Sequence, residues 1–149
     1  MATKILYIMR GISGSGKSTH AKSIDPTGKF ICSADNYFID PKTNRYKFIG
    51  IELDKAHAKC FDKFTKLIKK KSASIVLDNT NIKIKDFKDY VDLAKRNGYS
   101  ITVVAFLPVG DDGKVNLKYV RQCADRNKHG VDYEVCLNQA RCFEVDPVD

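Results

Sequence analysis

Short apolar runs alternate along the chain with stretches in which apolar residues recur every three or four positions. The apolar runs, rich in β-branched residues, lie at 5–9, 30–32, 75–77 and 101–107. The stretches with helical spacing lie at 53–67, 84–94 and 117–124, and a last helix is predicted after Asp132. This alternation predicts an α/β fold in which a central parallel sheet carries helices on both faces. Ligands of such sheets bind at the carboxyl ends of the strands.

The length and composition narrow the class of protein. A chain of 149 residues has room for one domain, which we place at 1–149. No apolar stretch approaches the ~18 residues of a membrane span, and the first residues run into a strand without a signal-peptide cleavage site. The five scattered cysteines form no C-x-x-C pair, and the histidines lack metal-ligand spacing. We therefore expect an intracellular protein, cytoplasmic or nuclear, with reduced thiols and no structural metal.

The formal net charge of +8 adds a candidate partner. Basic surfaces bind polyanions because each phosphate that a lysine or arginine neutralises releases counterions. A lysine-rich surface that serves only solubility gives the same charge. The charge alone leaves both interpretations open.

A glycine-rich turn after the first strand supplies the first specific chemistry. Residues 11–18, GISGSGKS, fit the pattern G-x-x-x-x-G-K-[ST] between a predicted strand and a predicted helix. Glycines let successive N–H groups face a phosphate, and the helix adds its positive N-terminal end. Lys17 is expected to reach the β- and γ-phosphates, and the hydroxyl of Ser18 to hold Mg²⁺. The predicted nucleotide-binding residues are Gly11, Ser13, Gly14, Ser15, Gly16, Lys17, Ser18 and Thr19.

Two acidic residues follow strands at the edge where a kinase would place them. Asp35 comes after the run at 30–32, and a carboxylate there can accept the proton of an attacking hydroxyl. Its alternative role is a helix N-cap. Asp78 ends the run at 75–77 and resembles the acidic residue that holds Mg²⁺ through water. Its alternative role is to form a turn with Asn79 and Asn81.

Four sequence blocks in this order resemble the P-loop 5′-polynucleotide kinase family. The blocks are MRGISGSGKST, SADNYF, IVLDNTNIK and ADRNKHGV, and they span nearly the whole chain. The resemblance implies a P-loop NTPase-type parallel sheet with a helical lid, and transfer of the γ-phosphate of ATP to the 5′-hydroxyl of RNA or DNA. It assigns the loop residues to Lys17 and Ser18, the general base to Asp35, and an arginine-bearing lid to 121–129.

The chain departs from the phage member of this family at two places. Phe38 replaces an arginine that contacts substrate, and an aromatic ring there can stack on a terminal base. His129 stands where the phage lid has an arginine, so Arg126 is the first candidate for the transition-state arginine and Arg121 the second. For Arg121 the alternative is a solvated helix face, with a pair to Asp125.

The remaining candidates concern the acceptor and the lid. Tyr37 and Phe38 either pack in the core or line a base-binding slot. The block DNTN leaves Asp78 or Asn79 in the functional position, with Asn81 nearby as a third substrate-binding candidate. Residues 108–114, PVGDDGK, are either a hinge leading to the lid or an ordinary surface loop.

The sequence thus predicts a polynucleotide 5′-hydroxyl kinase that uses ATP and Mg²⁺. Two alternatives remain: a small-metabolite or mononucleotide kinase on the same scaffold, and a nucleotide-binding module without transfer activity. The basic charge and the DNTN block favour a polynucleotide, and Asp35 beside an intact Lys17 argues against an inactive module. The choice between RNA and DNA, and the oligomeric state, stay open.

Overall fold

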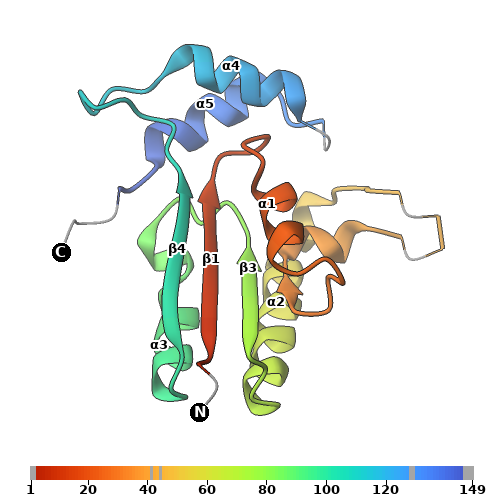
Figure 1. The fold of residues 1–149 in the computed structure, drawn as a ribbon. Coiled ribbons are helices and arrows are strands. Elements are labelled where there is room, and N and C mark those ends of the chain that lie inside the picture. The colour runs from red at the N-terminus through yellow and green to blue at the C-terminus, as the bar shows by residue number, and fades with distance from the viewer. Residues whose placement is uncertain (1–2, 41, 44, 128–129, 146–149) are drawn as a thin grey trace.

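A four-stranded parallel sheet forms the centre of the computed structural model, which describes residues 3–40, 42–43, 45–127 and 130–145. The strands are β1 (Ile5–Gly11), β2 (Ile31–Cys32), β3 (Ser74–Asp78) and β4 (Ser100–Phe106). Their order across the sheet is β2-β3-β1-β4, and every pairing is parallel (Figure 1). The carboxyl ends of the strands therefore meet at one edge, as the sequence predicts.

Among the described residues, five α-helices and three short 3₁₀ turns surround this sheet. The helices are α1 (Lys17–Ile24), α2 (Leu53–Lys69), α3 (Lys88–Arg96), α4 (Leu117–Arg126) and α5 (Tyr133–Cys142). The turns are η1 (Ala34–Phe38), η2 (Gly50–Glu52) and η3 (Ile84–Asp86). Asp132 is the N-cap of α5 and accepts a hydrogen bond from the backbone N–H of Val135. The predicted helix after Asp132 is confirmed.

The two faces of the sheet are covered by different helices. Alternate residues of β1 divide between them, since Leu6 and Ile8 pack in the core with α2 and α3, while Met9 packs on the face of α1. Phe64 of α2 is fully buried in the larger core. The predicted α/β architecture, with helices on both faces, is confirmed.

Helices α4 and α5 form a separate layer above the carboxyl ends of the strands (Figure 1). Val120 and Cys123 of α4 pack with Cys136 and Leu137 of α5, and Ile12 from the turn after β1 completes this cluster. The predicted loop at 108–114 leads into α4 and is closed by an antiparallel bridge between residues 109 and 115. The pair of helices therefore lies against the glycine-rich turn.

A single arginine at the end of β1 joins these layers. Arg10 is fully buried, and its guanidinium donates to the carbonyl oxygens of Asn81, Ile82 and Glu144 at 2.8, 3.0 and 2.6 Å. The cation lies over the rings of Phe87 and Phe143. Arg10 thus ties the chain that follows α5 to the sheet. In the part of the chain that the structure describes, no helix is long and apolar enough to cross a membrane.

Candidate active site

The glycine-rich turn between β1 and α1 forms an open backbone cradle. Gly14 and Gly16 have φ angles of 81° and 99°, which L side chains rarely adopt. Gly16 is also the N-cap of α1, so the positive end of that helix faces the turn. Ser15 is buried with its hydroxyl turned towards Gly11, and its backbone N–H donates to the carbonyl oxygen of Ile12 at 3.1 Å, which closes the turn. This geometry fits the predicted phosphate-binding role.

Helices α4 and α5, which we call the lid helices, contact the cradle directly. A Cβ placed on Gly14 would lie 2.0 Å from the carbonyl oxygen of Cys123 in α4, so a glycine is required where the lid backbone touches the loop. From α5, the side-chain Oε1 of Gln139 accepts from the N–H of Ser13 at 2.9 Å. The thiol of Cys136 donates to the carbonyl oxygen of Ser13 at 3.7 Å. Sequence reasoning missed Gln139 and Cys136, because no local pattern links positions so distant in the chain.

Ser18 and Asp78 come together as the metal hypothesis requires. The hydroxyl of Ser18 donates to Oδ2 of Asp78 at 2.9 Å, and Asp78 is 7% exposed at the end of β3. A hydroxyl and a carboxylate are the hard oxygen donors that Mg²⁺ prefers, and the ion usually keeps several waters beside them. The residues present therefore fit a Mg²⁺ ion that also contacts bound phosphates.

Lys17 at the start of α1 is influenced by both acidic residues. Its ammonium donates to the carbonyl oxygen of Ile12 at 3.3 Å. Burial lowers the pKa of Lys17, and the nearby carboxylates of Asp78 and Asp35 oppose that shift. The negative charges of both carboxylates therefore act on the ammonium of Lys17.

Asp35 stands on η1 with an exposed side chain. The N-cap of η1 is Ser33, whose hydroxyl oxygen accepts from the N–H of Asp35 at 3.2 Å. The N-cap role considered for Asp35 is therefore wrong. Asn79 fixes the same turn to β3, because its side-chain Oδ1 accepts from the N–H of Ala34 at 2.9 Å. Asn79 thus positions the turn that carries the carboxylate.

Tyr46 is a site residue that the sequence did not reveal. Its hydroxyl donates to Oδ1 of Asp35 at 3.4 Å. Burial, followed by the neighbouring charge of Asp35, raises the pKa of Tyr46 to about 12, so the phenol keeps its proton at neutral pH. An antiparallel bridge between Ile39 and Tyr46 brings the tyrosine back to η1. Only the path of the chain between the two residues creates this contact.

Two predicted acceptor contacts need correction. Phe38 is 6% exposed and packs in the core, so base stacking by this ring is not supported. Asn81 is 3% exposed, and its side-chain amide donates to the carbonyl oxygen of Met9 at 2.8 Å. Its side-chain amide therefore links the loop after β3 to β1, and its burial gives a substrate little access to it. Tyr37 is only half-buried, and the ammonium of Lys59 lies 5.7 Å from the centre of its ring.

The lid arginines differ in their surroundings. Arg126 is exposed, and its guanidinium donates to the sulfur of Cys123 at 3.5 Å, next to the point where α4 touches the cradle. Arg121 instead lies 3.9 Å from the centre of the Tyr133 ring. Among the described residues no ion pair joins Arg121 to Asp125. His129 lies outside the described residues.

Comparisons with known proteins identify the family of the chain. Residues 6–141 match the model of a family described as "AAA domain". Human NEDD4-binding protein 2 is 31% identical over 133 residues, which are 87% of this chain and 7% of that protein. The chain therefore spans a small part of that relative's length.

Solved structures share the fold at low sequence identity. A chain of the Pnkp1/Rnl/Hen1 RNA repair complex has a TM-score of 0.65 and 16% identity, with 95% of this chain and 44% of that chain covered. A gluconokinase from Sinorhizobium meliloti has a TM-score of 0.56 and 14% identity, with 97% and 78% covered. These likenesses show a P-loop NTPase-type, kinase-like fold. Because the family model matches residues 6–141, the chain belongs to the AAA-domain family.

Proposed function

We propose that this protein transfers the γ-phosphate of ATP to the 5′-hydroxyl end of a polynucleotide. The observation that carries the proposal is that two carboxylates with different surroundings lie at the carboxyl ends of the neighbouring strands β2 and β3, where Asn79 next to Asp78 holds the turn of Asp35. Asp78 is buried and accepts a hydrogen bond from Ser18, which suits a group that binds a metal ion. Asp35 is exposed on η1, which suits a base that an incoming hydroxyl has to reach. Phosphoryl transfer needs both roles at one edge of the sheet.

The cradle binds and orients the triphosphate. The N-terminus of α1 would face the phosphates, and the ammonium of Lys17, which donates to the carbonyl oxygen of Ile12 in the same turn, would contact the terminal ones. Ser18 and Asp78 would hold Mg²⁺, which supplies charge neutralisation on the β- and γ-phosphates when bound. Arg126, beside the cradle on α4, would stabilise the negative charge that develops on the phosphates in the transition state.

Asp35 serves the acceptor. Its carboxylate takes the proton of the 5′-hydroxyl as that oxygen attacks the γ-phosphorus in line, and ADP leaves from the opposite side. The hydroxyl of Ser33 and the amide of Asn79 hold the turn, and Tyr46 holds one carboxylate oxygen. The proton moves to a group whose position is set before substrate arrives.

The choice of a polynucleotide acceptor is supported by the charge of +8, by the order of the four sequence blocks, and by the fold likeness to a chain of an RNA repair complex. The fold likeness to a gluconokinase, of which 78% is covered, supports a small polyol as the second candidate acceptor.

The test is transfer from γ-labelled ATP in the presence of Mg²⁺. We expect labelling of 5′-OH oligonucleotides, none of matched 5′-phosphorylated ones, and none of gluconate or nucleosides. Efficient labelling of a small hydroxyl compound with no transfer to oligonucleotides would overturn the acceptor assignment. Binding of ATP without transfer to any acceptor would leave a nucleotide-binding module.

A further inference from the structure

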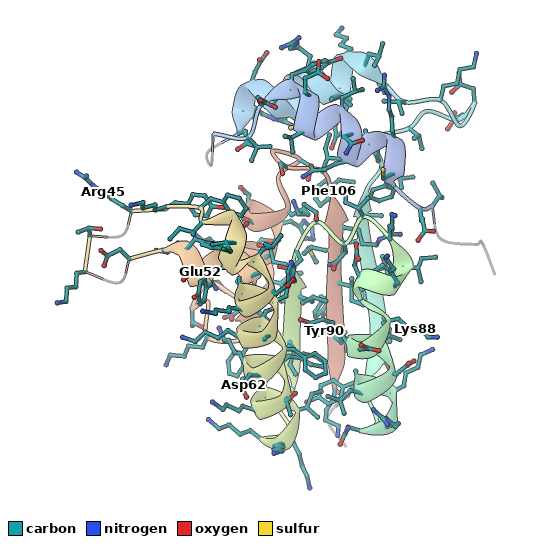
Figure 2. All side chains as sticks on the ribbon, turned by 180° about the vertical axis from the view of Figure 1, so that it is seen from behind. Arg45, Glu52, Asp62, Lys88, Tyr90 and Phe106 are labelled. Atoms are coloured by element: carbon teal, nitrogen blue, oxygen red, sulfur yellow. The ribbon has the colours of Figure 1, made fainter. Side chains whose placement is uncertain are left out.

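An apolar surface lies on residues 45–53, between the turn that carries the proposed base and α2, and we call these residues the acceptor segment. It carries four of the ten large hydrophobic side chains that are exposed among the described residues. These are Phe48 at 53%, Ile49 at 39%, Ile51 at 92% and Leu53 at 39% exposed. Such a concentration of exposed apolar groups on one short segment indicates a binding surface. Figure 2 shows Arg45 at the outer end of this segment and Glu52 where it returns to α2.

Ring contacts connect this surface to Asp35. The hydroxyl of Tyr46 donates to the Asp35 carboxylate, and the Tyr46 ring lies 6.2 Å from the ring of Phe38. Phe38 in turn contacts Phe48, with 5.1 Å between ring centres. Gly50 lies beneath the same Phe48 ring, because a Cβ built there would be 3.5 Å from it. The Phe48 ring is thus fixed from one side and exposed on the other, two ring contacts away from the Tyr46 that touches the base.

The charges around this surface suit a polyanion. The acceptor segment holds two basic residues, Arg45 and Lys47, and one acidic residue, Glu52, and Lys42 precedes it. Tyr37, which contacts Phe38 at 5.1 Å, lines an open pocket of about 560 Å³ on α2. The charged side chains that line this pocket are Lys59, Lys63, Lys66 and Asp62. Basic side chains near an exposed aromatic ring are a combination that single-stranded nucleic acids bind.

We propose that the acceptor segment is a stacking platform for the unpaired bases at the 5′ end of a single-stranded polynucleotide, with Phe48 as its central ring. The inference rests on the proposed function, because it places the 5′-hydroxyl of that strand at Asp35. A flat aromatic ring accepts any base, whereas a base paired in a blunt duplex cannot leave its partner to lie on it without loss. The protein should therefore select single-stranded ends over blunt duplex ends, with little preference for base identity.

The test is a double-mutant cycle in which one change is Phe48→Ala and the other is removal of the terminal bases from the substrate. Binding of a 5′-OH single strand is measured by fluorescence anisotropy without ATP, for a strand with all its bases and for one whose first two nucleotides are abasic. We expect each change alone to weaken binding roughly 5- to 150-fold, and both changes together to weaken it no more than one. Phe48→Tyr should restore binding. Phe30→Ala, at an exposed phenylalanine before β2, is the matched control and should change nothing.

Several results would overturn the platform. These are normal binding by Phe48→Ala, an equal loss for the intact and the abasic strand, or an equal loss for a blunt duplex. A change in sedimentation between wild type and Phe48→Ala, with binding unaltered, would make the surface a contact between copies of this chain. Because binding is measured without ATP, a strand that binds through Phe48 but receives no phosphate would overturn the proposed function and leave the platform standing.

Discussion

The two halves of the proposed site are built in different ways. The phosphate side, residues 11–18 with Asp78, is held by backbone geometry, by a buried carboxylate and by direct contacts from both lid helices. The acceptor segment is largely exposed and is held to η1 by a side-chain hydrogen bond and ring contacts. Triphosphates are the same for every kinase of this kind, so their cradle can be rigid. The acceptor is what distinguishes one such enzyme from another, and it meets the more adaptable surface.

The largest effect should come from Lys17→Met, which removes the cation of the phosphate side. ATP affinity and transfer should both fall, by about 10³-fold or more in kcat/KM, because the terminal phosphates lose their main charged contact. Without ATP the variant should be more stable than wild type, because burial outweighs the attraction of the carboxylates and lowers the pKa of Lys17.

The stability difference between wild type and Lys17→Met should change with pH. A lysine whose pKa is lowered in the folded state binds fewer protons there than in the unfolded chain, so wild type should gain stability relative to Lys17→Met as pH rises towards 10.5. Thermal melting of both proteins between pH 8 and 10.5 measures the difference. A wild type that is the more stable protein at pH 8 would show that Lys17 is well compensated without phosphate.

Arg126→Ala should lower transfer by about 10²–10³-fold while ATP affinity stays nearly unchanged, because the arginine acts on charge that develops in the transition state. Arg121→Ala is the matched control, since Arg121 is occupied by the ring of Tyr133. Steady-state kinetics with separate ATP titrations measure both. If Arg121→Ala is the crippling change, the assignment of the lid arginine is wrong while the reaction class stands.

Gly14→Ala tests the contact between cradle and lid. The new methyl group would meet the carbonyl of Cys123 at 2.0 Å, so α4 has to move or the loop has to distort. Gly28→Ala is the control, because its φ of 73° carries similar backbone strain and a Cβ there meets nothing within 4 Å. We expect Gly14→Ala to cost about 1–3 kcal/mol of unfolding free energy beyond the control. Equal losses in urea denaturation would mean that the lid is not packed on the loop in solution.

Tyr46→Phe should give the smallest effect, because one neutral donor to a carboxylate is lost from the acceptor side. Transfer should fall about 3- to 10-fold, as expected for one hydrogen bond, with ATP affinity unchanged. Tyr99→Phe removes a hydroxyl that donates to the carbonyl of Ser72, far from the site, and should leave transfer unchanged. A drop in ATP affinity for Tyr46→Phe would place the tyrosine on the phosphate side instead.

The sequence predicted the phosphate side in detail because its physics is local. A strand, a glycine turn and a helix are consecutive, and Asp78 is recognised from its place after a strand. Tyr46, Gln139 and Cys136 escaped such reasoning, and for Phe38 the choice between the core and a base-binding slot stayed open. Tyr46 reaches Asp35 only through the path of the segment between them, and Gln139 reaches Ser13 across 126 positions. Phe38 lies in a short 3₁₀ turn, where neither the strand period nor the α-helix period predicts which side is buried.

The measurement that tests the central claim most directly is single-turnover transfer by Asp35→Asn, with ATP affinity determined on the same protein. Asparagine keeps the size of the side chain but cannot take the acceptor proton. Transfer should therefore fall about 10²–10⁴-fold while ATP affinity and melting temperature stay near wild type. Asp54→Asn, which removes an equally exposed carboxylate from the first turn of α2, should transfer normally. Near-normal transfer by Asp35→Asn would contradict the account and remove Asp35 from the chemistry.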